Sequence, residues 1–177
     1  MKPVTLLLAL ANVLVYLAAP SVDQYGFVPT HASLGTAFSS MFVHDPTGLA
    51  HIGGNLAFLL VFGTLVEREL GSVRFLMLYL GAGLGGAVCH ALVNPSSTDA
   101  MVGASGAIFG ILAASAMLRS WAVAFVCVYF GMNLVALFAP ELVGMKDVAV
   151  GAHVGGFAVG FAMTRIVFSG KLQEVQS

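Results

Sequence analysis

The stretch GASGAIFG, residues 103–110, places a serine among small residues inside a long uncharged part of the chain. Gly106 and Gly110 are about one helical turn apart, so a helix through this stretch has a face that another helix can approach closely. The same spacing recurs in two other segments, at Gly81 and Gly85 and at Gly156 and Gly160. These segments predict helices packed closely around residues 103–110.

The composition of the whole chain is that of a membrane protein. Of the 177 residues, 59% are hydrophobic and 8% are charged, whereas about a quarter of the residues of a soluble protein are charged. The net charge of −1 gives no basic surface for binding nucleic acid. We expect one transmembrane domain over residues 1–177 and no separate soluble domain.

Six uncharged runs of 17 to 24 residues have the length of a membrane crossing, which takes about 20 residues. They cover residues 3–22, 46–66, 75–98, 100–118, 120–140 and 148–164. The first run lacks a convincing signal-peptide cleavage site, so we interpret it as a helix. The predicted fold class is all-α: a polytopic membrane protein with a six-transmembrane-helix bundle.

A seventh uncharged run, residues 24–44, contains Pro29, two histidines and a cluster of serine and threonine. It lacks the unbroken apolar character of a crossing helix. We expect a long first loop associated with the membrane, since irregular backbone is tolerated there only where protein or water satisfies it.

The distribution of basic residues predicts the orientation of the bundle. Alternating six helices puts six of the seven on one side of the membrane and only Lys146 on the other; the six are Lys2, Arg68, Arg74, Arg119, Arg165 and Lys171. Because lysine and arginine concentrate on the cytoplasmic side, we expect both termini to be cytoplasmic.

Four polar residues then fall at a similar depth in the outer half of the membrane. Counted from apparent helix starts at residues 48, 100 and 148, Ser105 and His153 are each five residues in, and Asn55 is seven. At 1.5 Å per residue these positions are roughly 8 to 11 Å below the helix starts. His51 precedes Asn55 by four residues, so the two share one helix face.

Each of these residues has an ordinary structural interpretation when it is taken alone. A serine among glycines commonly just lets helices approach, and a histidine or asparagine in a membrane helix can simply form an interhelical hydrogen bond. Together they fit acyl transfer by serine, which needs a hydroxyl, a base and donors for the oxyanion. No carboxylate lies near this layer, so the prediction is a dyad of Ser105 and His153. His51, Asn55 and the amide of Ser105 are the predicted oxyanion donors.

These motifs resemble those of the rhomboid family of intramembrane serine proteases. The resemblance rests on four segments spread over most of the chain: His51-x-x-x-Asn55, Glu67 to Gly71, Gly103-Ala104-Ser105-Gly106, and Ala152-His153-x-x-Gly156-x-x-x-Gly160. One departure is the first loop, which lacks the Trp-Arg pair that the family often has.

The resemblance implies a six-helix core of bacterial type in the inner membrane, with the active site opening to the outer side. It implies Ser105 as nucleophile, His153 as general base, and His51 and Asn55 as oxyanion donors. Phe109 matches the aromatic residue that the family places against its catalytic histidine. The implied substrates are transmembrane proteins in the lipid bilayer, cleaved without metal, cofactor or ATP. Gly103, Gly106, Gly156 and Gly160 would support the site by allowing close helix approach.

Two other functions remain open at this point. All five histidines map to the outer half, which also suits a metal-binding membrane protein or transporter, although His51 does not begin the HExxH motif of a zinc protease. A rhomboid-like scaffold that binds membrane helices without cutting them is the second alternative. The presence of both Ser105 and His153 argues against the scaffold.

Overall fold

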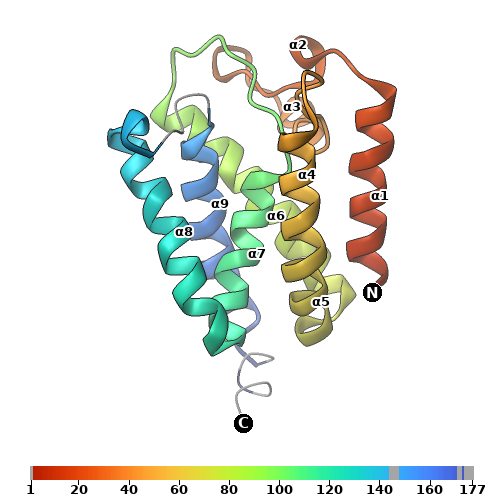
Figure 1. The fold of residues 1–177 in the computed structure, drawn as a ribbon, viewed down its shortest axis with the longest axis vertical. Coiled ribbons are helices and arrows are strands. Elements are labelled where there is room, and N and C mark those ends of the chain that lie inside the picture. Colours follow the sequence, from red (N-terminus) through yellow and green to blue (C-terminus); the bar gives the residue numbers. More distant parts are fainter. Residues whose placement is uncertain (1, 144–147, 171–172, 174–177) are drawn as a thin grey trace.

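The computed structural model describes residues 2–143, 148–170 and 173, and within them nearly all regular structure is helical (Figure 1). Between Phe27 and Met101 there is an isolated antiparallel β-bridge. The elements are α1 (Pro3–Ala18), α2 (Val22–Tyr25), η1 (Pro29–His31), α3 (Leu34–Ser39), α4 (Leu49–Phe58), η2 (Leu59–Gly63), α5 (Thr64–Leu70), α6 (Ser72–Val93), α7 (Ser105–Leu118), α8 (Ser120–Phe138), η3 (Pro140–Val143), α9 (Val150–Ala162) and η4 (Met163–Val167).

Four helical segments are long and apolar enough to cross a membrane, by length and composition. They are the continuous segment α4–η2–α5, α6, α8, and the continuous segment α9–η4. The other two predicted crossings correspond to shorter apolar helices: α1 has 16 residues and α7 has 14. The all-helical, polytopic class is confirmed, while the number of six crossings stays a prediction.

Three glycine-containing helices, α6, α7 and α9, pack backbone against backbone. A methyl group added at Gly156 would overlap the carbonyl of Gly106, and one added at Gly160 would overlap the backbone of Gly110. On the neighbouring contact, a Cβ at Gly86 would lie 2.7 Å from the carbonyl oxygen of Ala152. The glycine spacing therefore has the predicted consequence, because α9 lies directly against both α6 and α7.

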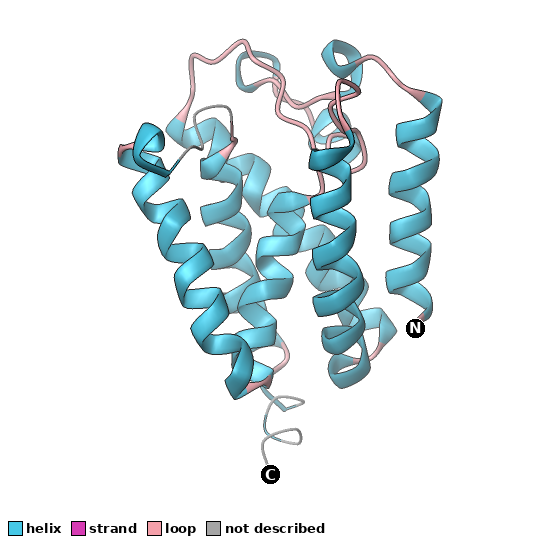
Figure 2. Ribbon diagram, in the orientation of Figure 1, coloured by secondary structure: helices cyan, strands magenta, loops and turns pink. Residues whose placement is uncertain are grey.

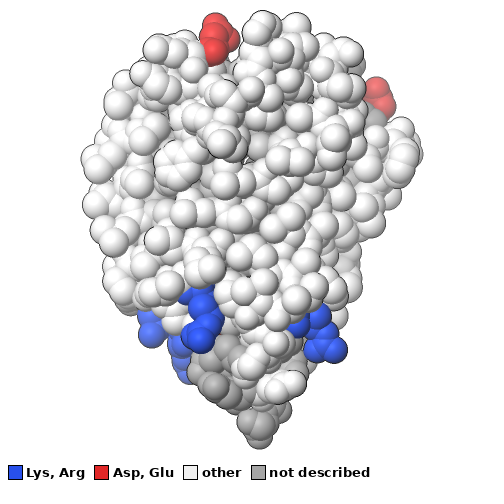
Figure 3. Space-filling view, turned by 180° about the vertical axis from the view of Figure 1, so that it is seen from behind, with Lys and Arg blue, Asp and Glu red and all other residues white. Residues whose placement is uncertain are grey.

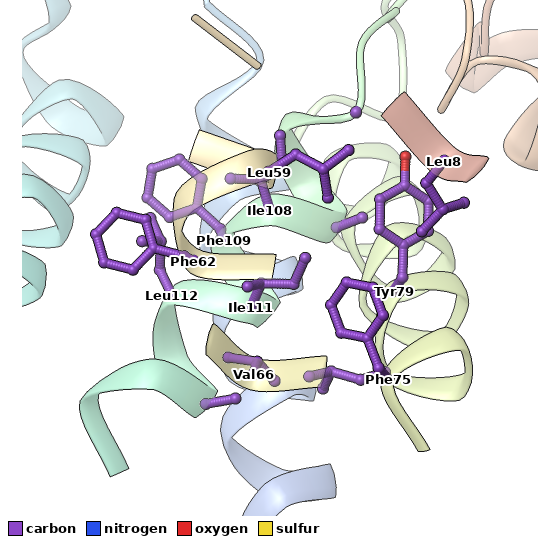
Figure 4. Packing of buried hydrophobic residues seen from close by; sticks show 14 of the residues in the cluster. Leu8, Leu59, Phe62, Val66, Phe75, Tyr79, Ile108, Phe109, Ile111 and Leu112 are labelled. Carbon is purple, nitrogen blue, oxygen red and sulfur yellow. The ribbon is translucent and has the colours of Figure 1, made fainter. Parts of the chain in front are cut away.

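A hydrophobic cluster fixes η2 and α6 against α7 (Figure 4). Phe75 and Tyr79 of α6 and Ile111 of α7 are completely buried, and Leu59 of η2 is 1% exposed. These large side chains fill the interior between η2, α6 and α7, the helix that begins at Ser105.

The basic side chains gather at one end of the molecule (Figure 3). The start of α1 and the end of α9 lie at this same end (Figure 1), whereas the long loops lie at the opposite end (Figure 2). Two of the lysines used to predict orientation, Lys146 and Lys171, fall outside the described residues.

Glu67, in the last two turns of α5, is a charged residue that the fold buries. Its side chain is 1% exposed and accepts hydrogen bonds from the backbone amides of Val4 and Thr5 at 3.0 and 2.8 Å. The hydroxyls of Thr5 and Ser72 also donate to it, at 2.8 and 2.7 Å. The carboxylate therefore satisfies free amides in the first turn of α1 and fixes that helix to the end of α5.

The first loop is built from short helical turns, α2, η1 and α3. Phe27 and Met41 are buried at 4% and 3% exposure, whereas Leu34 and Phe38 are exposed at 84% and 49%. The Met41 side chain packs against Gly83 of α6. The loop is thus held on the bundle by buried apolar residues while it presents other apolar residues outward.

Candidate active site

Ser105 is the first residue of α7, so the expectation that it lies five residues inside a helix starting at residue 100 is wrong. The chain turns at Gly103, whose φ of 114° lies in the left-handed region that favours glycine. The Gly103 amide donates to the carbonyl of Ser40 at 2.8 Å. An absence of charge does not distinguish loop from helix, which is why counting uncharged residues put the helix start too early.

His153 lies in the first turn of α9, which begins at Val150 rather than at residue 148. Its Nε2 is 2.8 Å from the Oγ of Ser105, a hydrogen-bonding distance suited to proton transfer. Gly106 follows Ser105 by one residue, Gly156 follows His153 by three, and the two glycines are in close backbone contact. This packing of α7 against α9 brings the serine and histidine side chains together.

Aromatic rings support the imidazole of His153 on one face. Phe109 stacks on it with ring centroids 4.3 Å apart and planes inclined by 13°. Tyr129 of α8 stacks in turn on Phe109, at 5.3 Å. These contacts limit how far the imidazole can tilt away from Ser105.

Asn133 of α8 is a site residue that the sequence analysis missed. Its Oδ1 lies 2.6 Å from the Nδ1 of His153, and the Asn133 side chain is completely buried. The search for a third member considered carboxylates only. A buried asparagine in a membrane helix is itself a signal of function or of helix contact, and that signal could have identified it.

The predicted oxyanion donors His51 and Asn55 lie beside Gly103, two residues before the serine. A Cβ added at Gly103 would lie 2.6 Å from the Nε2 of His51 and 3.5 Å from the Nδ2 of Asn55. Within the described residues, the buried Nδ2 of Asn55 has no hydrogen-bond partner. A buried donor without a partner is rare in proteins, and this one belongs to a residue that lines the same cavity as Ser105.

A cavity of about 690 Å³ joins these residues. Ser105, His153, His51 and Asn55 all line it, and it extends to Asp45 in the loop before α4. Asp45 is exposed, and hydrogen bonds from the amide and hydroxyl of Thr47 lower the pKa of its carboxyl group. An ionised, exposed carboxylate thus marks one margin of the cavity, so this margin lies at the surface of the protein.

Among residues 2–143, 148–170 and 173, no three His, Cys, Asp or Glu side chains come together as a metal site would require. His44 and His51 do meet edge to face, with ring centroids 5.1 Å apart. Two histidines are fewer than the three ligands sought, so this pair does not support the alternative of a metal transporter.

The fold and this cavity define a class: a polytopic helical membrane protein with a serine hydroxyl hydrogen-bonded to a buried histidine. A family model of the Rhomboid domain matches residues 31–170 of the chain. The chain belongs to the rhomboid family, and it is an integral membrane protein with several membrane-spanning helices.

Three relatives illustrate the similarity. RHOMBOID-like protein 1 of Arabidopsis thaliana is 32% identical over 136 residues, covering 71% of this chain and 32% of that protein. Rhomboid protease GluP of Bacillus subtilis is 33% identical over 117 residues, covering 64% of this chain and 22% of that protein. Rhomboid-type serine protease 2 of Emericella nidulans is 32% identical over 131 residues, covering 70% and 25%. The chain spans a third or less of the length of these curated relatives.

Proposed function

We propose that this protein is an intramembrane serine protease that hydrolyses peptide bonds in or near the transmembrane segments of other membrane proteins. The observation that carries the proposal is the 2.8 Å contact between the Oγ of Ser105 and the Nε2 of His153 at a cavity that reaches the surface. Two relatives are named as proteases, GluP and the Emericella protein, and these names support the same reaction here.

In the proposed reaction, Ser105 Oγ attacks the carbonyl carbon of the scissile bond as His153 Nε2 takes its proton. The carbonyl π electrons move onto oxygen and form a tetrahedral oxyanion. When the carbon–nitrogen bond breaks, His153 returns the proton to the leaving amine, which leaves an acyl group on Ser105. Water from the cavity then hydrolyses this ester by the same proton transfers in reverse order.

The oxyanion would be stabilised by donors that surround the start of α7. The backbone amide of Ser105 lies in the first turn of the helix, where amide groups lack an intrahelical acceptor. The Nδ2 of Asn55, which has no hydrogen-bond partner in the described part of the chain, and the ring of His51 approach from α4. Donors already in place for the developing charge are commonly the largest single contribution to catalysis of this kind.

The remaining parts of the proposal concern the membrane setting. We place residues 1–177 in one transmembrane domain with six crossings, including the shorter α1 and α7, and the first loop in contact with the membrane. The grouped basic side chains support cytoplasmic termini and a cavity that opens to the outer side, in a bacterial inner membrane. The partners are transmembrane substrates and the lipid bilayer, with no metal or cofactor in the reaction.

The test is cleavage of a model transmembrane substrate by the purified protein in detergent. We expect the native protein to cleave it, and both Ser105→Ala and His153→Ala to abolish cleavage while keeping the native melting temperature. A fluorophosphonate probe should label the native protein and leave Ser105→Ala unlabelled. Full activity of the His153→Ala protein would refute the assignment.

The same assay separates the two alternatives. A non-catalytic scaffold would bind the substrate but neither cleave it nor react with the fluorophosphonate. A metal-dependent enzyme would lose activity in a chelator and regain it with zinc. Chelator-resistant cleavage that depends on Ser105 supports the serine mechanism against both.

A further inference from the structure

The bond between Asn133 and His153 joins two buried side chains from different helices. Asn133 is 0% exposed and His153 is 7% exposed, and the Oδ1 to Nδ1 distance is 2.6 Å. On the other side of the ring, Nε2 meets Ser105. Both ring nitrogens of His153 are therefore in hydrogen bonds, one with α8 and one with α7.

The orientation of the Asn133 amide is fixed by a second contact. Its Nδ2 lies 2.9 Å from the carbonyl oxygen of Tyr129, one turn earlier in α8. A backbone carbonyl can only accept a hydrogen bond, so the amide nitrogen must point toward Tyr129 and the amide oxygen toward the imidazole. Flipping the amide would set a carbonyl against a carbonyl and lose this bond.

This orientation determines which nitrogen of His153 carries the proton. Because Oδ1 can only accept, Nδ1 must be the donor, and in the neutral ring Nε2 then holds the lone pair. That lone pair faces the Ser105 hydroxyl, which can donate to it. The neutral ring is held in the tautomer in which Nε2 can act as a base toward serine.

We propose that Asn133 is a positioning residue that fixes the tautomer and the orientation of His153, as a third residue behind the Ser105–His153 pair. The proposal rests on the proposed function and adds a residue to it. Cysteine proteases with a Cys-His-Asn arrangement show that a neutral amide can serve in this role.

The apolar surroundings explain why an amide suits this position. An isolated carboxylate in a membrane helix is expensive to bury, whereas an amide is neutral and here has its Nδ2 and Oδ1 hydrogen-bonded. When His153 takes the serine proton, its Nδ1–H becomes a stronger donor to Oδ1. The bond should therefore strengthen in the transition state, which makes it a contribution to turnover more than to substrate binding.

The kinetic test compares Asn133→Leu, which removes the acceptor at similar volume, with Asn133→Asp, which keeps an acceptor. Leu134→Ala is the matched control, since Leu134 is the next residue in α8 and is 42% exposed. We expect Asn133→Leu to lower kcat about tenfold to a hundredfold, the range for a hydrogen bond to a group that becomes charged, with KM nearly unchanged. Asn133→Asp should retain more of kcat than Asn133→Leu, and Leu134→Ala should match the native protein.

A spectroscopic test does not depend on activity. In protein labelled with ¹⁵N-histidine, the signals of His153 are identified by their absence from the His153→Gln protein. We expect a protonated Nδ1 and an unprotonated Nε2 in the native protein at neutral pH, and loss of this single tautomer in Asn133→Leu. If the leucine variant does not fold, the native spectrum alone decides.

Two results would overturn the proposal: an unprotonated Nδ1 in the native protein, or a folded Asn133→Leu protein with native kcat and the native tautomer. Failure of the proposed function gives a different result: either the native protein would not cleave the substrate, or Ser105→Ala would leave cleavage intact, while the tautomer of His153 would still report on Asn133.

Discussion

At the scale of single residues, an unpaired buried donor identifies the next position to test. The Nδ2 of Asn55 has no hydrogen-bond partner within the described residues and lies near the serine. A polar group buried without a partner destabilises the folded protein, so its position suggests a role during the reaction. The oxyanion that forms when Ser105 attacks would give this donor its acceptor.

We therefore predict that Asn55→Ala lowers kcat about a hundredfold to a thousandfold, as the loss of one oxyanion donor typically does. Folding should be preserved, because the removed group makes no hydrogen bond that the fold would lose. The measurement is kcat with the model substrate, alongside the melting temperature. Asn94→Ala, which changes an exposed asparagine at the end of α6, should have native kcat. An Asn55→Ala protein within twofold of native would remove Asn55 from the oxyanion site.

His44, in the loop before α4, makes the stability of the protein depend on pH. Its Nδ1 donates to the carbonyl of Phe42 at 3.1 Å, and its buried Nε2 has no partner in the part of the chain that the structure describes. Burial lowers the pKa of His44 from 6.5 to about 4; the bond to Phe42 opposes this and nearby His51 adds to it. The folded protein therefore favours the neutral ring.

The stability that the folded protein gains from keeping His44 neutral is fully present above pH 6.5, the pKa of this histidine in the unfolded chain. It is lost as the pH falls toward 4, the pKa in the folded protein. A difference of about 2.5 pKa units corresponds to about 3 kcal/mol. We predict that the native protein loses stability between pH 6.5 and 4 and that His44→Gln reduces this loss. The free energy of unfolding in detergent at several pH values measures it. His31→Gln, which changes an exposed histidine in the same loop, should keep the full pH dependence, and equal slopes in all three proteins would contradict the prediction.

At the scale of helices, the contact between α7 and α9 determines whether the serine and histidine meet. Gly156 and Gly160 of α9 lie against Gly106 and Gly110 of α7 with no room for a side chain. Since Ser105 and His153 are in the first turns of the same two helices, any separation of the backbones also separates the reacting atoms.

We predict that Gly156→Ala destabilises the protein by about 1 to 3 kcal/mol, the usual effect of overfilling a packed interior, and also lowers turnover. Gly131→Ala on α8 is the matched control, because a Cβ there meets no atom within 4 Å. Alanine is favoured over glycine in a helix by up to about 1 kcal/mol, so this control should be as stable as the native protein or more so. Unfolding free energy and cleavage rate are measured for both variants. Equal stability of the two variants would show that the glycine contact is not limiting.

At the scale of the whole molecule, a row of aromatic rings in contact joins α8 to the helical segment that begins with α4. Phe125 of α8 lies 5.9 Å from Phe58, 5.5 Å from Phe62 and 5.9 Å from Tyr129, measured between ring centroids. Phe58 and Tyr129 also line the cavity. The aromatic row therefore forms part of the cavity wall between α4 and α8.

Phe125→Ala should therefore speed cleavage of a transmembrane substrate severalfold if opening of this row limits entry. Each aromatic pair contributes roughly 0.5 to 1.5 kcal/mol, and the substitution removes the two pairs that join α8 to Phe58 and Phe62. Labelling by a small fluorophosphonate should stay unchanged, since such a probe can enter from the cavity itself. Val128→Ala, at a position that is 67% exposed, is the control and should leave both rates unchanged. Slower cleavage by Phe125→Ala would show that the row positions the substrate instead of restricting it.

The sequence was informative wherever the signal was local or followed helical spacing. Long uncharged runs predicted an all-helical membrane protein, and the paired glycines predicted close packing, which Gly106 and Gly156 display. Charge patterns were less reliable for single residues. Glu67 is buried against the start of α1, and no local pattern indicates this because its partners Val4 and Thr5 are more than 60 residues away in the chain.

By itself the sequence determined that the chain is a helical membrane protein and that Ser105, His153, His51 and Asn55 are the residues to consider, since composition and spacing are properties of the chain alone. Only the tertiary structure decided that α7 begins at Ser105, that the cavity joins the four residues, and that Asn133 meets His153. Those features depend on a turn at Gly103 and on contacts between separate helices. Such contacts form when separate helices pack in one arrangement, and they cannot be predicted from the spacing of residues within a single helix.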